Sequence, residues 1–237
     1  MDMQKELDRI LEALTAYKND TACQGVVLGI SGGKDSTVVA MLAKAVFGDK
    51  VLGVLMPNGE QKDIADSLEI CKQLGLAHYV VNIREAFEGV LSAIPLEVTA
   101  QAKTNIPPRL RMTTLYAIAQ TLGYRVIGTG NASESYIGWT TKWGDGAYDL
   151  NPIGSLTCTE VVALGRLLAE RMGLDLSFVL KAPSDGLTGK TDEDNFGFTY
   201  RELDTYIRTG EGSEETVAKI ERMHRASAHK RTMPLKF

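Results

Sequence analysis

The sequence has little cysteine, no excess of positive charge and no long apolar run. Its three cysteines are Cys23, Cys71 and Cys158, and none of them forms a CxxC pair. This spacing provides neither a disulfide framework nor a zinc site, and it is typical of a reducing compartment. The net charge of −4 gives no overall basic field, so we expect no nucleic-acid partner.

The apolar segments are too short for a membrane protein. None approaches the roughly 20 residues that a membrane-spanning helix needs. The N-terminal segment MDMQKELDRILEALTAY carries acidic residues at helical spacing and does not resemble a signal peptide. We therefore expect a cytoplasmic protein without a membrane partner. A length of 237 residues suits a single domain, 1–237.

Short apolar runs alternate with segments of helical periodicity. Because these runs are apolar throughout, they indicate a parallel sheet that is covered by helices on both faces. We predict a doubly wound α/β fold with five parallel strands. The ranges predicted as strands are 25–30, 50–57, 78–83 and 125–130. The ranges predicted as helices are 3–18, 36–47, 61–74, 105–123, 159–172, 199–209 and 213–228.

The loop SGGKDS, residues 31–36, joins the first predicted strand to the helix that follows it. Its glycines let backbone N–H groups converge on an anion, and the helix adds the positive end of its dipole. A carboxylate such as Asp35 is unexpected in a site for an anion alone, but it can bind Mg²⁺, which bridges phosphate oxygens. The loop is not a Walker A motif, because Asp35 follows Lys34 and position 28 is Leu28. The pattern indicates a site for the phosphates of ATP.

Two more polar segments follow predicted strands. Pro57-Asn58-Gly59 comes after the second strand, and Thr129-Gly130-Asn131 comes after the fourth. Ligands of such sheets bind at the carboxyl ends of the strands. We therefore expect these segments to share one site with residues 31–36. The Gly-, Thr- and Trp-rich residues 131–158 are predicted to form an ordered loop there, and residues 183–198 a surface loop, for which a lid is one open role.

The form SGGxDS after a buried strand resembles the pyrophosphate loop of the N-type ATP pyrophosphatases, which have an adenine nucleotide alpha hydrolase-like fold. Within that superfamily, further segments between about residue 22 and residue 234 are similar to NAD synthetases. These segments are NIPPRLRMTTLY (105–116), GTGNASE (128–134), GWTTKWGDGAYDLNPIGSLT (138–157), TDEDNFGFTYRELD (191–204) and HKRTMP (229–234). Without a glutamine-hydrolysing domain, the length suggests the ammonia-dependent form.

The resemblance implies a reaction in two steps. The carboxylate of deamido-NAD (nicotinic acid adenine dinucleotide) is adenylated by ATP with release of pyrophosphate. Ammonia then displaces AMP and leaves NAD. The resemblance also implies Mg²⁺, and a homodimer with the deamido-NAD site at the subunit interface. Such an enzyme acts mainly by positioning its substrates and stabilising charge.

The resemblance also assigns residues. It implies Asp35 and Glu134 as metal ligands, and Asp35, Lys142 and Asp145 as catalytic residues. The positions implied for ATP binding are Gly29, Ser31, Gly32, Gly33, Lys34, Ser36, Arg109, Thr129 and Ser184. The positions implied for deamido-NAD binding are Asn105, Arg109, Trp139, Lys142, Asp149, His229 and Lys230.

The chain departs from the family pattern where cations are common. Leu55 and Met56 stand near one such position and Cys158 stands at another, with Lys181 and Lys190 as candidate replacements for the missing cation. Pro107-Pro108 precedes Arg109 where a lysine is common, and the acid near residue 184 is shifted by one position to Asp185.

Structural readings remain open for several residues. Arg109 could be a solvated charge at a helix start, and Glu134 could be an acid in the first turn of a helix. Lys142 and Asp145 could form a surface ion pair, and residues 229–231 could be a basic tail. Trp139 could equally belong to the core, and Cys158 could simply fill space. Two other functions stay open as well: another amidating ATP pyrophosphatase, and a nucleotide-binding module without catalysis.

Overall fold

A parallel sheet lies at the centre of the molecule. The structure is a computed structural model that describes residues 2–60, 64–181, 191–234 and 236. Four strands form the sheet in the order β3-β2-β1-β4, and each neighbouring pair is parallel. They are β1 (Val26–Gly29), β2 (Val51–Leu55), β3 (Ala77–Val80) and β4 (Arg125–Val126). The predicted parallel α/β architecture is confirmed.

A single bridge takes the place of a fifth strand within the described ranges. Ile127, just after β4, forms an isolated parallel bridge with Leu150. The backbone N–H of Gly128 donates to the Leu150 carbonyl at 2.8 Å, and the N–H of Asp149 donates to the Val126 carbonyl at 2.9 Å. Pro152, two residues after Leu150, has no N–H to donate, which disfavours further pairing.

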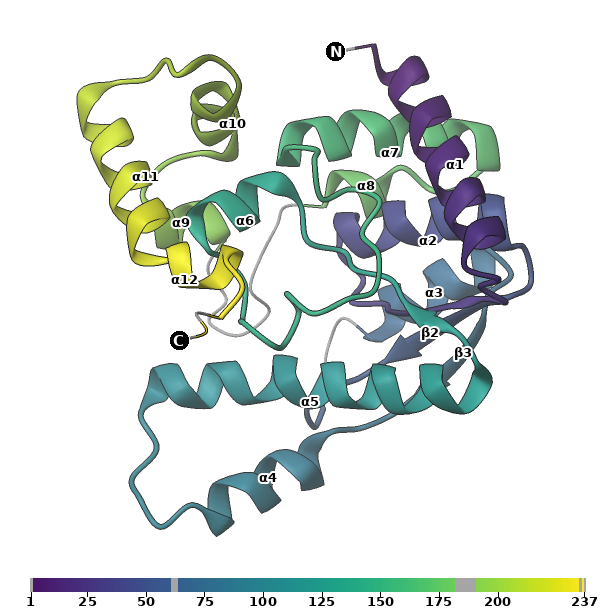
Figure 1. Ribbon diagram of the computed structural model, residues 1–237, viewed down its shortest axis with the longest axis horizontal. Helices are drawn as coiled ribbons and strands as arrows, with labels where there is room; N and C mark the ends of the chain where they lie inside the picture. Colours follow the sequence, from purple (N-terminus) through teal and green to yellow (C-terminus); the bar gives the residue numbers. More distant parts are fainter. Residues whose placement is uncertain (1, 61–63, 182–190, 235, 237) are drawn as a thin grey trace.

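Helices cover both faces of the sheet (Figure 1). One face carries α1 (Met3–Asp20), α2 (Lys34–Phe47), α3 (Ile64–Gln73), α7 (Cys158–Met172) and α8 (Ser177–Leu180). The other face carries α4 (Arg84–Ala93) and α5 (Ala100–Leu122). Within β1, Val26 and Leu28 pack into the first core and Val27 into the second. This two-sided burial explains why β1 and β2 are apolar throughout, whereas the edge strand β3 is exposed and contains His78.

Five helices from the second half of the chain form a group beside the carboxyl ends of the strands (Figure 1). Its members are α6 (Ala132–Ile137), α9 (Asp192–Phe196), α10 (Tyr200–Thr209), α11 (Glu214–Ala226) and α12 (Ala228–Arg231). They pack around a third apolar cluster that includes Phe196, Leu203 and Ile220. In the described parts of the chain, no helix has the length and apolar character that crossing a membrane requires.

The structure corrects three sequence-based boundaries. Helix α5 begins at Ala100, not at residue 105, because Thr99 caps it through a hydrogen bond from the Ala102 N–H at 3.3 Å. Pro107 and Pro108 therefore lie inside the helix. The predicted loop 131–158 contains α6, and the predicted loop 183–198 contains α9. Residues 183–190 of the proposed lid lie outside the described residues.

Candidate active site

The SGGKDS loop leaves the N-terminus of α2 available to an anion. Gly32 has a φ of 80°, which disfavours any side chain, and Gly33 occupies the N-cap without a side-chain hydrogen bond. The Ser31 and Ser36 hydroxyl oxygens lie 3.1 Å apart. The Thr37 hydroxyl donates to the Gly33 carbonyl at 2.9 Å. The first N–H groups of a helix have no partner within the helix, so here they can donate to phosphate oxygens.

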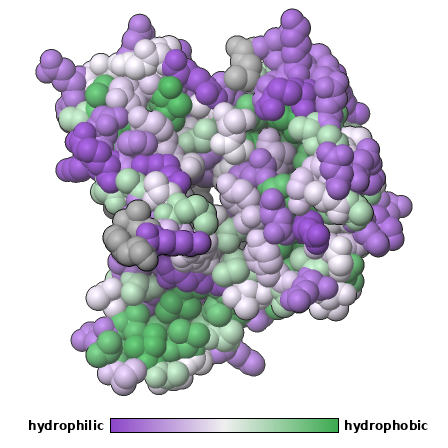
Figure 2. Space-filling model, viewed as in Figure 1, coloured by the Kyte–Doolittle hydropathy of each residue, from purple (hydrophilic) through white to green (hydrophobic). Residues whose placement is uncertain are grey.

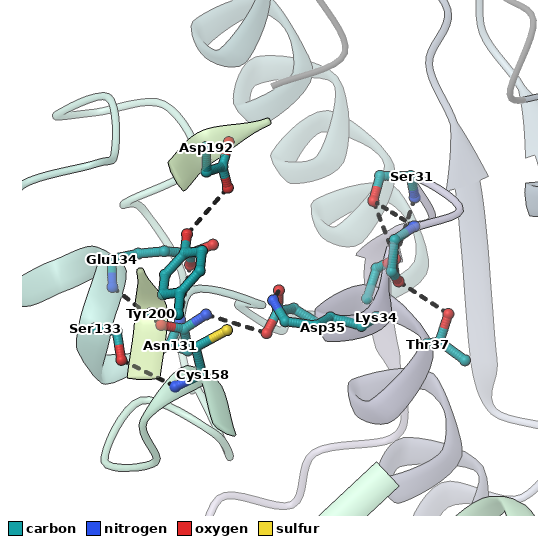
Figure 3. Close-up of polar contacts among 12 residues, drawn as sticks. Ser31, Lys34, Asp35, Thr37, Asn131, Ser133, Glu134, Cys158, Asp192 and Tyr200 are labelled. Atoms are coloured by element: carbon teal, nitrogen blue, oxygen red, sulfur yellow. Dashed lines mark hydrogen bonds and ion pairs between the residues drawn. The ribbon is translucent and has the colours of Figure 1, made fainter. Parts of the chain in front are cut away.

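Asn131 connects this loop to α6. Its Nδ2 donates to Asp35 Oδ1 at 3.2 Å (Figure 3). Its Oδ1 accepts from the Glu134 N–H at 3.0 Å, and its own N–H donates to Glu134 Oε2 at 3.0 Å. The two residues thus form a capping box at the start of α6. The sequence placed Asn131 near the site but gave it no role, although the pattern N-x-x-E at positions 131–134 was a usable signal for a capping box.

The carboxylates share their surroundings with a buried cation. Lys34 Nζ lies 2.5 Å from Asp35 Oδ2, and only 3% of the lysine is exposed. Burial, followed by the charge of Asp35, raises the pKa of Glu134 to about 8. Burial also raises the pKa of the Cys158 thiol to about 12, so Cys158 suits a space-filling role better than a reactive one.

Asp204 fixes the N-terminal ends of α6 and α7. The Ser133 hydroxyl donates to Asp204 Oδ1, and the Thr159 N–H donates to Asp204 Oδ2 at 2.7 Å. Ser133 Oγ in turn accepts from the Cys158 N–H at 2.9 Å. Asp204 is 5% exposed and Ser133 is fully buried. The network therefore holds in place the helix start that carries Glu134.

The carboxylate oxygens of Asp35 and Glu134 are suitable ligands for Mg²⁺. Mg²⁺ prefers oxygen ligands and commonly uses one or two carboxylates together with substrate phosphates. Within the described residues, no group of three or more His, Cys, Asp or Glu side chains forms a complete metal cage. A Mg²⁺ ion here would therefore take its other ligands from phosphate and water.

A second group of predicted residues gathers where α5 meets the loop after α6. The Thr141 hydroxyl donates to Asn105 Oδ1 at 2.8 Å, and Asp145 Oδ1 accepts from the Thr141 N–H at 2.8 Å. Arg109 Nε donates to the Lys142 carbonyl at 3.3 Å. The structure thus brings Asn105, Arg109, Lys142 and Asp145 together, and their roles in catalysis and ligand binding stay predictions.

The C-terminal basic residues hold the same loop from its other side. Lys230 Nζ donates to the carbonyls of Gly138 and Thr140, both at 2.7 Å. Lys142 Nζ donates to the carbonyl of His229, whose side chain is exposed. Residues 229–231 are therefore ordered and form α12, in contrast to a disordered tail.

Two predicted ligand residues have structural contacts. Asp149 accepts from the Val126 N–H at 2.8 Å and from the Tyr116 hydroxyl at 3.3 Å. The Trp139 ring packs edge-on against Phe196 with ring centroids 4.6 Å apart. These contacts give both residues a role in the fold, and their contact with deamido-NAD stays a prediction.

One of the two candidate replacement cations, Lys181, lies within the described residues. Lys181 Nζ pairs with Asp66 Oδ2 at 2.7 Å, while Lys190 and Ser184 lie outside the described residues. Leu55 and Met56 are buried in the cores on the two faces of the sheet. Arg111, which the sequence analysis did not assign, reaches the same place, because its Nε donates to the Met56 carbonyl at 3.1 Å.

The chain is similar to known proteins along its whole length. The family model described as NAD synthase matches residues 6–234. The NH(3)-dependent NAD(+) synthetase of Carboxydothermus hydrogenoformans is 43% identical, with 99% of this chain and 97% of the relative covered. The enzyme of the same name from Pyrococcus horikoshii is 40% identical, with 99% of this chain and 95% of the relative covered.

Solved structures agree with this match. The NMN synthetase of Francisella tularensis superposes with a TM-score of 0.91 at 34% identity, covering 100% of this chain and 98% of the other. The NH3-dependent NAD synthetase of Campylobacter jejuni gives 0.81 at 30% identity, covering 100% and 99%. The chain therefore belongs to the NH3-dependent NAD+ synthetase family, whose members are ATP-using ligases of NAD biosynthesis.

Proposed function

We propose that this chain converts deamido-NAD to NAD+ with ATP and ammonia, through an adenylated intermediate. The observation that carries the proposal is the convergence of the uncapped N-terminus of α2 with the Asp35 and Glu134 carboxylates, held together by Asn131. The N-terminus of α2 can bind phosphates, and the two carboxylates can bind a divalent cation. Full-length similarity to NH(3)-dependent synthetases supports the choice of amide nitrogen donor.

In the first step, a nicotinate carboxylate oxygen attacks the α-phosphorus of ATP and the bond to the β-phosphate oxygen breaks. Ser31, Ser36 and the N–H groups that begin α2 would hold the departing pyrophosphate. Mg²⁺, held by Asp35 and Glu134, would neutralise phosphate charge when bound. No side chain needs to form a covalent bond in this step, so the residues act by orienting groups and balancing charge.

In the second step, the nitrogen lone pair of ammonia attacks the carboxyl carbon, AMP leaves with its oxygen, and the nitrogen loses a proton. We assign the acceptor end of the site to Arg109, Lys142 and Asp145, which the loop 139–145 and α5 bring together. Asp145 is exposed and carries a carboxylate that could receive that proton.

A second candidate acceptor is nicotinic acid mononucleotide, which lacks the AMP half of the dinucleotide. The similarity to the NMN synthetase of Francisella tularensis, with its TM-score of 0.91, favours including it. Both acceptors present the same nicotinate carboxylate, so the same phosphate loop would serve either. The two functions differ only in the contacts made to the outer half of the acceptor.

One assay tests both acceptors. The protein is mixed with Mg-ATP, ammonium and either deamido-NAD or nicotinic acid mononucleotide, and pyrophosphate and the amidated product are measured. We expect one pyrophosphate per amide, with a larger kcat/KM for deamido-NAD. A larger value for the mononucleotide would establish the second candidate. Pyrophosphate release that needs neither acceptor would contradict both, and ATP binding without turnover would indicate a binding module.

We also propose that the protein forms a homodimer through the apolar face around α4. Figure 2 shows an apolar patch in the part of the molecule where α4 and the beginning of α5 lie. There, Leu96 is 76% exposed and Val90 is 37% exposed, which is costly for a surface left in water. Light scattering should give twice the chain mass, and Leu96→Lys with Val90→Lys should give the monomer. A monomeric wild type would contradict the proposal.

A further inference from the structure

Lys34 occupies a position that is unfavourable for a positive charge. It is the first residue of α2, where the helix dipole repels cations, and only 3% of it is exposed to solvent. Its Nζ forms an ion pair with Asp35 and lies over the Tyr200 ring, 5.6 Å from the ring centroid. The ammonium is therefore held by groups of the site itself.

These anions are the candidate metal ligands. Lys34 Nζ lies 2.5 Å from Asp35 Oδ2, and the Glu134 carboxyl is close enough to act on it electrostatically. The other Asp35 oxygen, Oδ1, accepts from Asn131 Nδ2 at 3.2 Å. Both oxygens of Asp35 thus have protein partners (Figure 3). A cation that binds Asp35 has to displace one of them.

Lys34 is the partner that can leave. Asn131 is fully buried and tied on both sides by its capping box with Glu134, whereas a lysine ammonium sits on a flexible four-carbon stem. A divalent ion beside the ammonium would also repel it. Once displaced, the ammonium needs another anion, since a buried unpaired charge is costly. The phosphate-binding loop that carries Lys34 would supply one.

We propose that Lys34 is an internal counter-ion that exchanges partners: it neutralises Asp35 in the metal-free protein and transfers its ammonium to the pyrophosphate group when a divalent ion binds Asp35. The first half stands on the metal-free geometry alone. The second half rests on the proposed function, because it requires a phosphate ligand in the loop. Lys181 instead forms an ion pair with Asp66, at 2.7 Å.

The two halves predict effects of opposite sign for one substitution, Lys34→Met. Without nucleotide, Mn²⁺ should bind about tenfold more tightly than to wild type, because no ammonium competes for Asp35. At saturating Mg²⁺, inorganic pyrophosphate should bind about tenfold more weakly, because the displaced ammonium is missing. Electron paramagnetic resonance measures the first quantity and calorimetry the second.

Controls separate the charge from general damage to α2. Lys44→Met changes a lysine on the same helix that pairs with Asp49 away from the loop, and it should leave both affinities unchanged. Lys34→Gln serves if the Met variant does not fold, and Lys34→Arg keeps the charge and should retain weak Mn²⁺ binding. Unchanged or weaker Mn²⁺ binding by the neutral variants would overturn the first half. Unchanged pyrophosphate binding would overturn the second half, whether or not the protein makes NAD+.

Discussion

Asn131 and Asp35 are joined by a 3.2 Å hydrogen bond across 96 positions of sequence. This bond ties the start of α6 to the start of α2, so the two candidate metal carboxylates depend on one fully buried amide. The bond thus connects a helix that packs on the sheet to the helical group beside it. It makes Asn131 a positioning residue for both carboxylates.

Replacing Asn131 by alanine should weaken the site and the fold together. The change removes an N-cap and the link to Asp35, which should lower the free energy of unfolding by about 1–2 kcal/mol. The affinity for Mn²⁺ should also fall. Urea denaturation and Mn²⁺ titration measure the two effects. The N-cap variant Thr99→Ala, on α5, should cost similar stability without changing Mn²⁺ affinity; equal metal effects of the two variants would contradict a specific role.

Asp204→Ala should destabilise the protein more strongly. It leaves the Ser133 hydroxyl and the Thr159 N–H without their buried acceptor, and the loss of a buried hydrogen-bonded carboxylate costs about 3 kcal/mol. Glu202→Ala removes an exposed carboxylate of the capping box on the same helix, which accepts from the Thr199 N–H at 2.8 Å, and should cost about 1 kcal/mol. Thermal and urea unfolding of both variants test this order. An Asp204 variant as stable as the Glu202 variant would show that the network does not hold the two helix starts.

Glu134 should make the metal-free protein less stable at higher pH. Its pKa is raised from 4.5 to about 8 in the folded state, so the folded chain keeps a proton that the unfolded chain releases. That contribution is complete below 4.5 and is lost as pH rises towards about 8. With a chelator present, Glu134→Gln should reduce the decline in unfolding free energy between those two values by at least about 1 kcal/mol. The exposed Glu12→Gln variant should keep the full decline, and an identical decline in Glu134→Gln would contradict the assignment.

The strands and the phosphate loop were predictable because their signals are local. A continuous apolar run such as 26–29 has to be buried on two faces, and Gly32-Gly33 before a helix indicates an anion site whatever surrounds it. Asp35 was predicted as a metal ligand from the chemistry of the loop, and Glu134 from the resemblance of its motif. Their geometry could not be predicted, because it depends on the Asn131–Asp35 bond between distant segments.

Other features depend on tertiary contacts that sequence patterns do not encode. The start of α5 was missed because two prolines masked the cap at Thr99. Asp204 was missed because a single acid on an amphipathic helix is usually solvated, and only its partners Ser133 and Thr159 reveal its role. Lys34 was identified from the loop motif, but its pairing with Asp35 was not.

The most direct test of the account is the turnover of Asp35→Ala with Mg-ATP, ammonium and deamido-NAD. Asp49→Ala, which removes an exposed acid beyond the other end of α2, is the matched control. We predict that Asp35→Ala loses at least about a thousandfold in kcat/KM for NAD+ formation, while the control keeps wild-type activity. Near-normal NAD+ formation by a folded Asp35→Ala protein would contradict the claim that this carboxylate holds the catalytic metal.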